Sequence, residues 1–184
     1  MEITEIFIIV GYGVVGGSLK YIDIWYDNLK RDPTLPIYAS AFFAGILMGV
    51  LMVYDPLSSI LLLSIIFATG ICGRIDNLSF RIVAFSSLFL LLITLIMRPF
   101  EDSITITSYV VLLLILTLSG VLDELLDEIG DKRNIKVLTT RPVLKIVLIA
   151  LWILNQYALL YVFCLLAFDF CYYLVSLLSR RKVS

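Results

Sequence analysis

The sequence predicts an all-α fold, a polytopic membrane helix bundle of about seven transmembrane helices that forms a single integral membrane domain over residues 1–184. Two observations predict this fold class. Hydrophobic residues make up 61% of the chain and charged residues 16%, whereas a soluble domain is typically about 45–50% apolar and about 25% charged. In addition, apolar runs that approach the length needed to cross a bilayer, about 17–25 residues, follow one another along the chain.

The first four predicted helices are separated by charged residues, Pro and Gly. Asp55-Pro56 separates the second helix from the third, and Gly73-Arg74 begins the segment between the third and the fourth. Pro and Gly interrupt helices, and charges interrupt apolar runs. The four helices are predicted over residues 6–22, 37–54, 57–72 and 82–97.

The last three predicted helices follow a charged hinge at residues 98–102. Beyond it, the run over residues 143–178 has no charged side chain except Lys145 and Asp169. At about 1.5 Å per residue this run is too long for a single span, so we divide it at Asn155-Gln156. The three helices are predicted over residues 104–122, 143–155 and 157–178.

The basic residues fall on one side of the membrane in this seven-helix topology. Of the 14 Lys and Arg residues, only Arg98 lies on the opposite side. Because positively charged loops face the cytoplasm, we predict an N-terminus outside and a C-terminus in the cytoplasm. We expect the plasma membrane of a prokaryote as the location, with a homo-oligomer as an alternative to a monomer.

Composition also excludes several functional classes. The net charge is −1, so no basic surface for nucleic acid is expected. The chain has no His, which excludes His-dependent triads and His metal sites. Its three cysteines lie in apolar stretches without a CxxC pair, and we expect them to be small buried residues.

Small residues predict where the helices touch. Gly13 and Gly17 form a GxxxG pattern in the first helix, and Ala41, Gly45 and Gly49 repeat at the same spacing in the second. Small residues let helix backbones approach closely in a membrane, where lipid provides no hydrophobic drive for association. We therefore expect these faces to be helix–helix contacts.

Acidic residues repeat at a spacing of four at two predicted helix ends. Asp23 and Asp27 end the first helix, and Asp123, Asp127 and Asp131 end the fifth. Residues four apart share a helix face, where like charges are destabilising unless something neutralises them. Mg²⁺, which is usually bound by one or two carboxylates plus substrate phosphates, is the cofactor that this pattern predicts, with these five aspartates as its ligands.

A less specific interpretation is that the acidic residues form solvated helix ends. We adopt it for Asp32, Glu124 and Glu128, and prefer a functional role for the two Asp repeats because ionisable groups at membrane depth are costly. Asp169 lies near the middle of the last helix, where it either pairs with a cation inside the bundle or is protonated.

Four basic residues on the same face are candidates for binding phosphate oxygens. Each is also a positive-inside signal, and the sequence alone does not separate the two roles. They are Lys20, Arg74, Lys132 and Arg133.

Two of these acidic segments resemble a known family. The segment 127–139, which begins Asp127-Glu128-Ile129-Gly130-Asp131, resembles the second aspartate-rich motif of the UbiA-type membrane prenyltransferases. The segment 21–28, followed by residues 35–37, resembles the first motif with its following Pro-Ile. The interval of four helices between the motifs also matches, so the chain looks like a family core that lacks the first and last helices.

The resemblance implies a Mg²⁺-dependent membrane enzyme that acts on a prenyl diphosphate. It implies transfer of the isoprenoid group to a lipid-soluble acceptor at the cytoplasmic face. The aspartates would bind the metal and the diphosphate, and the basic residues would help to bind the diphosphate. Asp23, Asp27, Asp127 and Asp131 would then be the catalytic set, with the membrane lipid as surroundings.

A cation transporter or channel that uses membrane carboxylates is the alternative. A transporter should carry several acidic residues at the bilayer midplane, whereas this chain has only Asp169 there and its other acidic residues crowd one interface. This distribution favours an interfacial enzyme.

Overall fold

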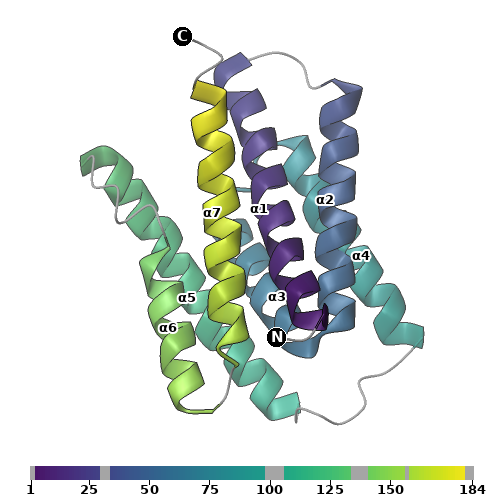
Figure 1. Ribbon diagram of the computed structural model, residues 1–184, viewed down its shortest axis with the longest axis vertical. Coiled ribbons are helices and arrows are strands. Elements are labelled where there is room, and N and C mark those ends of the chain that lie inside the picture. The colour runs from purple at the N-terminus through teal and green to yellow at the C-terminus, as the bar shows by residue number, and fades with distance from the viewer. Residues whose placement is uncertain (1–2, 30–33, 98–105, 134–140, 156–157, 181–184) are drawn as a thin grey trace.

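The computed structural model describes residues 3–29, 34–97, 106–133, 141–155 and 158–180. These residues form seven α-helices, as the apolar pattern predicts (Figure 1). The helices are α1 (Ile3–Leu29), α2 (Leu35–Tyr54), α3 (Pro56–Ile71), α4 (Leu78–Met97), α5 (Ile106–Arg133), α6 (Pro142–Ile153) and α7 (Leu160–Arg180).

Two helices extend well beyond the predicted apolar runs. α1 continues to Leu29 rather than ending at residue 22, and α5 continues to Arg133 rather than ending at residue 122. Both extensions carry the acidic repeats, whose spacing of four places them along one side of a continuing helix. The acidic motifs therefore lie within helical ends and not in loops.

Four of the helices are long and apolar enough to cross a membrane. The apolar stretches are Ile3–Tyr26 in α1, Leu35–Tyr54 in α2, Ile106–Gly130 in α5 and Leu160–Ser179 in α7. α3, α4 and α6 are apolar but have shorter apolar stretches. With 12 residues, α6 is about 18 Å long, which is less than the roughly 30 Å of a bilayer core.

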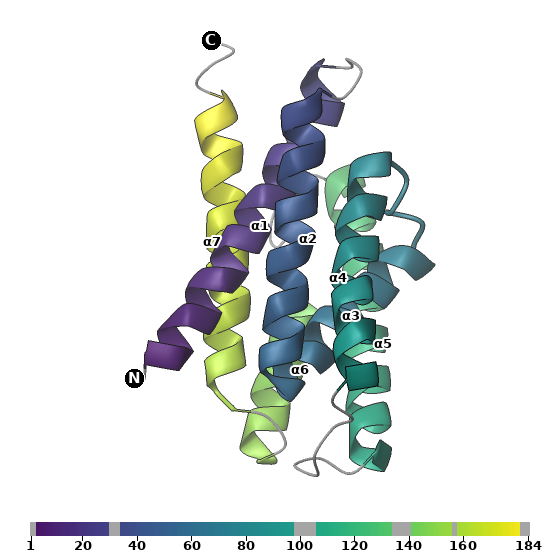
Figure 2. The same cartoon turned by 90° about the vertical axis from the view of Figure 1, so that its right-hand side faces the viewer.

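Successive helices run in alternate directions, so the N-terminus and the C-terminus lie at opposite ends of the bundle (Figures 1 and 2). The most extensive contacts join α1 to α7, α2 to α4, and α3 to α5. The ends of α1, α5 and α7 and the beginning of α6 consequently face the same end of the bundle. We call it the C-terminal end.

The small residues lie at helix–helix contacts, which confirms the prediction from their spacing. On α2, a Cβ atom added at Gly45 would lie 2.7 Å from the Val83 carbonyl oxygen of α4, and one at Gly49 would lie 3.1 Å from the Ser87 carbonyl oxygen. On α1, a Cβ atom at Gly13 would lie 3.0 Å from Sγ of Cys171 in α7. A side chain at Gly45 or Gly49 would therefore meet the backbone of α4, and one at Gly13 would meet the Cys171 side chain, at distances that force the neighbour to move.

The core surrounds α3, whose residues from Ser58 to Ile66 are all buried. Two buried hydroxyl groups in and next to α3 are satisfied inside their own helices, because Ser64 and Ser119 donate hydrogen bonds to carbonyl oxygens three or four residues earlier. Large apolar side chains such as Phe43, Phe85 and Ile96 point outward and are exposed. An apolar outer surface is stable in hydrocarbon but costly in water.

Candidate functional site

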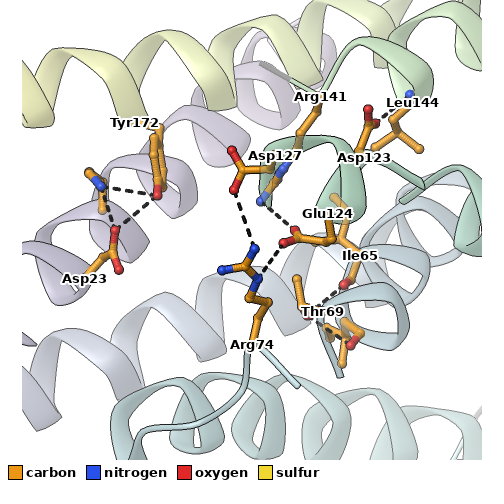
Figure 3. A network of polar contacts seen from close by, with 12 residues as sticks. Asp23, Ile65, Thr69, Arg74, Asp123, Glu124, Asp127, Arg141, Leu144 and Tyr172 are labelled. Carbon is orange, nitrogen blue, oxygen red and sulfur yellow. Dashed lines mark hydrogen bonds and ion pairs between the residues drawn. The ribbon is translucent and has the colours of Figure 1, made fainter. Parts of the chain in front are cut away.

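Polar side chains from five parts of the chain gather near the C-terminal end of the bundle (Figure 3). They come from α1, α5, α7 and the segments that precede α4 and α6. We call them the polar network, which comprises Lys20, Asp23, Arg74, Asp123, Glu124, Asp127, Arg141 and Tyr172.

The first half of the network joins α1 to α7. Lys20 Nζ lies 2.6 Å from Oδ2 of Asp23, one turn later on α1. Tyr172 of α7 donates a hydrogen bond to the same oxygen over 3.2 Å, and the Lys20 ammonium lies 4.8 Å from the centre of the Tyr172 ring. Lys20 thus neutralises the Asp23 carboxylate, and the Tyr172 hydroxyl holds that carboxylate in place.

The second half is centred on Glu124 of α5. Its Oε2 lies 3.5 Å from Nε of Arg74, and its Oε1 lies 3.7 Å from Nη2 of Arg141. Arg74 also lies 4.0 Å from Oδ2 of Asp127, one turn further along α5. One carboxylate therefore holds two guanidinium groups, which come from either side of it in the sequence.

Asp123 has a different set of contacts. Its Oδ1 and Oδ2 accept hydrogen bonds from the backbone N–H groups of Val143 at 2.9 Å and Leu144 at 2.7 Å. These N–H groups open α6, and the first N–H groups of a helix have no partner within the helix. Asp123 caps α6 from the neighbouring helix, and only 1% of its surface is exposed.

Aromatic rings connect the two halves. The Arg141 guanidinium lies 5.2 Å from the centre of the Phe168 ring, and that ring stacks on Tyr172 with 6.5 Å between centres. A cation is stabilised over the face of an aromatic ring. The order Lys20, Tyr172, Phe168, Arg141 thus makes one continuous contact path from α1 to the start of α6.

Cys72 lies next to the second half of the network. Burial raises the pKa of its thiol, the negative charge of Glu124 raises the pKa further, and the positive charge of Arg74 lowers it. Its thiol therefore reports on the charges of both partners. Cys72, Cys164 and Cys171 are all free thiols; Cys164 is buried and the other two are partly exposed.

A separate ion pair lies deeper in the bundle, between α6 and α7. Lys145 Nζ lies 2.5 Å from Oδ2 of Asp169, with 20% and 24% of the two side chains exposed. Of the two expectations for Asp169, pairing with a cation is therefore the one that the structure supports.

The structure places the predicted site residues as follows. Asp23 and Asp127 lie at the same end of the bundle, with Lys20 and Arg74 as their ion-pair partners (Figure 3). Four further predicted residues belong to the last turns of α1 and α5, but their side chains lie outside the described part of the chain: Asp27, Asp131, Lys132 and Arg133. Among the described residues, no three His, Cys, Asp or Glu side chains group closely enough to hold a metal ion.

The expectation that Glu124 is a solvated residue is wrong. Only 12% of its side chain is exposed, because Arg74 and Arg141 cover it. Glu128 is exposed, as expected, and Asp32 lies outside the described residues. Glu124 therefore cannot serve as a neutral control in mutagenesis.

Arg141 and Tyr172 are the network residues that the sequence analysis missed. In the sequence Arg141 is only one of the basic residues that indicate the topology, and Tyr172 lies in an apolar helix. The connection between α5 and α6 offers a signal for Arg141, because helices joined by a short loop pack side by side and bring the start of the second next to the end of the first. No comparable signal identifies Tyr172.

Comparison of the chain with protein family models, with curated proteins and with solved structures found no match.

Proposed function

We propose that the chain is an integral membrane enzyme of seven membrane-embedded helices that binds a prenyl diphosphate with Mg²⁺ at the polar network. It would transfer the isoprenoid group to a lipid-soluble acceptor, with the C-terminal end of the bundle in the cytoplasm. One observation carries the proposal: the acidic ends of α1 and α5 face the same end of the bundle, and Asp23 and Asp127 each form an ion pair with a cation there.

The donor set fits Mg²⁺ in part. Mg²⁺ takes oxygen ligands and is usually bound by one or two carboxylates together with substrate phosphates. Asp23 and Asp127 supply such carboxylates, and Asp27 and Asp131 would complete the set. We leave Asp123 out because backbone N–H groups occupy both of its oxygens. When bound, Mg²⁺ supplies positive charge that stabilises the diphosphate leaving group.

The chain's own cations would bind the phosphate oxygens. In the structure, Lys20 forms an ion pair with Asp23 and Arg74 forms one with Asp127. Each carboxylate is therefore neutralised by a cation of the chain. A diphosphate bound to Mg²⁺ brings both signs of charge to the site. The carboxylates could then bind the Mg²⁺ while the cations bind the phosphate oxygens, so that no charge is left unpaired. Lys132 and Arg133 follow Asp131 on the same helix and are further candidates.

The apolar outer surface suits the rest of the substrate. A prenyl chain is soluble in the bilayer, and the bundle exposes apolar side chains over its sides. The diphosphate would then lie at the network while the chain remains among apolar side chains or lipid. The resemblance of residues 21–28 and 127–139 to prenyltransferase motifs points to the same substrate class.

The direct test is binding of farnesyl diphosphate to the purified protein in lipid nanodiscs, with and without Mg²⁺. Asp23→Asn and Asp127→Asn should each weaken Mg²⁺-dependent binding at least tenfold, because Asn keeps the shape but removes the charge that the cation requires. Asp76→Asn, an exposed residue in the turn before α4, is the matched control and should bind normally. Equal binding by all four proteins, or no binding by the wild type, would contradict the proposal.

The orientation has its own test. Thr34 and Ala158 are exposed and lie before α2 and α7, at opposite ends of the bundle. In a Cys72→Ser background, a membrane-impermeant maleimide added to intact cells should label Ala158→Cys and not Thr34→Cys. Labelling of both, or of Thr34→Cys alone, would reject an outside N-terminus.

The alternative is a cation transporter or channel. Its main candidate, Asp169, is paired with Lys145, whose positive charge repels cations at that depth. Ion flux into vesicles that is abolished by Asp169→Asn, together with no binding of farnesyl diphosphate, would favour transport over the enzyme.

A further inference from the structure

Glu124 lies between two arginines that are far apart in the sequence. Arg74 belongs to the turn that follows α3, and Arg141 is the residue before α6. Glu124 Oε2 lies 3.5 Å from Nε of Arg74, and Oε1 lies 3.7 Å from Nη2 of Arg141. Two guanidinium groups so close would repel each other without the carboxylate between them.

The contacts of this group leave donors for a further partner. Hydrogen bonds between N–H and O atoms span about 2.7–3.2 Å, so separations of 3.5 and 3.7 Å are ion pairs rather than hydrogen bonds. Each guanidinium has five N–H donors. The Arg74 side chain is 45% exposed, and Nη1 of Arg141 is buried without a hydrogen-bond partner among the described residues.

The backbone of Arg141 is also held in an unfavourable conformation. Its φ of 50° and ψ of 58° are in the left-handed region, which costs a residue with a side chain about 1–2 kcal/mol. It also precedes Pro142, which disfavours helical backbone angles in the residue before it. Such strain persists only where surrounding contacts fix it, and it is found preferentially at functional sites. Here the contacts are Glu124, the Phe168 ring and the Asp123 cap on the next two N–H groups.

We propose that Glu124 is a positioning residue that holds Arg74 and Arg141 as a pair of guanidinium groups, both of which bind one diphosphate. The proposal rests on the proposed function, and it adds Arg141 as a ligand-binding residue and Glu124 as a residue that acts only through the two arginines. Arg binds phosphate through two parallel N–H···O bonds, so two arginines match the two phosphates of a diphosphate. A ligand with one phosphate would engage only one of them.

A purely structural role for the Arg–Glu–Arg group makes a different prediction. Buried triads of this composition in other proteins can be replaced by apolar residues without loss of fold or function. If the group only holds α5, α6 and the turn after α3 together, substitutions will change thermal stability but not the preference for diphosphate over monophosphate. The ratio of the two affinities therefore separates the roles.

The experiment measures binding of inorganic pyrophosphate and of inorganic phosphate, each with Mg²⁺, to the full chain in nanodiscs. Glu124→Gln, Arg141→Lys and Arg74→Lys should each reduce the ratio of pyrophosphate to phosphate affinity about tenfold. Arg81→Lys, an exposed arginine in the first turn of α4, should leave the ratio unchanged. Because Arg74 is nearly half exposed, Arg74→Lys gives a folded protein even if Glu124→Gln does not.

Two negative results have different meanings. If the wild type binds pyrophosphate and Asp23→Asn abolishes that binding while all three network variants keep the wild-type ratio, the positioning role is wrong and the proposed function stands. If the wild type binds neither anion with Mg²⁺, the proposed function fails and this inference fails with it.

Discussion

Asp123 and Asp127 illustrate how one repeat on one helix can carry two roles. Both lie on α5, four residues apart, but Asp123 caps α6 while Asp127 faces Arg74. The difference arises from the start of α6, which packs against Asp123 and covers it. A carboxylate that accepts two backbone N–H groups satisfies donors that would otherwise be unpaired in the membrane.

We expect Asp123→Asn to destabilise the protein by about 1–3 kcal/mol, because the Asn amide group replaces one acceptor by a donor and leaves a buried N–H unpaired. Unfolding in a mixed-micelle titration with SDS measures the change, with the exposed Asp76→Asn as control. A variant as stable as that control, but deficient in Mg²⁺-dependent binding, would instead make Asp123 a metal ligand.

The reactivity of Cys72 should report on the charges of the network. Glu124→Gln removes a negative charge and lowers the pKa of the thiol, so that more thiolate is present at pH 8 and alkylation is faster. Arg74→Gln removes a positive charge, raises the pKa and slows alkylation. Rates measured against pH, with Cys72→Ser as background, check both signs. Equal rates in the two variants would show that neither charge acts on Cys72.

At the scale of helices, small residues set which pairs touch. Gly45→Ala should destabilise the protein by about 1–3 kcal/mol, because the new Cβ would lie 2.7 Å from the Val83 carbonyl oxygen. Gly70→Ala is the matched control, since a Cβ there meets only the flexible end of Ile75 at 3.7 Å. Ala is favoured over Gly in a helix, so this variant should be neutral or slightly more stable. Equal effects at both sites would contradict the close approach of α2 to α4.

The pair of Lys145 and Asp169 should act as one unit between α6 and α7. Removal of one partner, as in Lys145→Met or Asp169→Leu, leaves an unpaired charge and should cost on the order of 3 kcal/mol. The double variant, Lys145→Met with Asp169→Leu, should recover most of this loss because no charge then remains. A double-mutant cycle on unfolding free energies measures the coupling. Additive losses would mean that the two side chains do not stabilise each other.

All seven helices could be predicted from the sequence because each depends on local information, such as an apolar run and a Pro, Gly or charge that ends it. The glycine contacts of Gly45 and Gly49 could also be predicted, since only helix contact explains that spacing in a membrane. The partners of Asp123, Glu124 and Asp169 could not, because they depend on which helices are neighbours. The apolar pattern identifies each helix but not the helix that packs against it, because apolar side chains lie on the outer surface as well as in the core.

At the scale of the whole molecule, the order of helices brings distant parts of the chain to one end. α7 packs against α1, which brings Tyr172 to Asp23, and α6 follows α5 closely, which brings Arg141 to Glu124. The acidic ends of α1 and α5 thereby meet Lys20 of α1 and two arginines from the segments before α4 and α6. We attribute to this arrangement the proposed binding of Mg²⁺ and a diphosphate.

A crystal structure of the protein with Mn²⁺ in place of Mg²⁺ and with inorganic pyrophosphate tests this claim most directly, because Mn²⁺ is located by its anomalous scattering. We predict an anomalous peak between the C-terminal ends of α1 and α5, in contact with Asp23 and Asp127, with Arg74 and Arg141 bound to the pyrophosphate. A structure at saturating Mn²⁺ without a peak there, in which Lys20 still pairs with Asp23 and Arg74 with Glu124, would contradict the account.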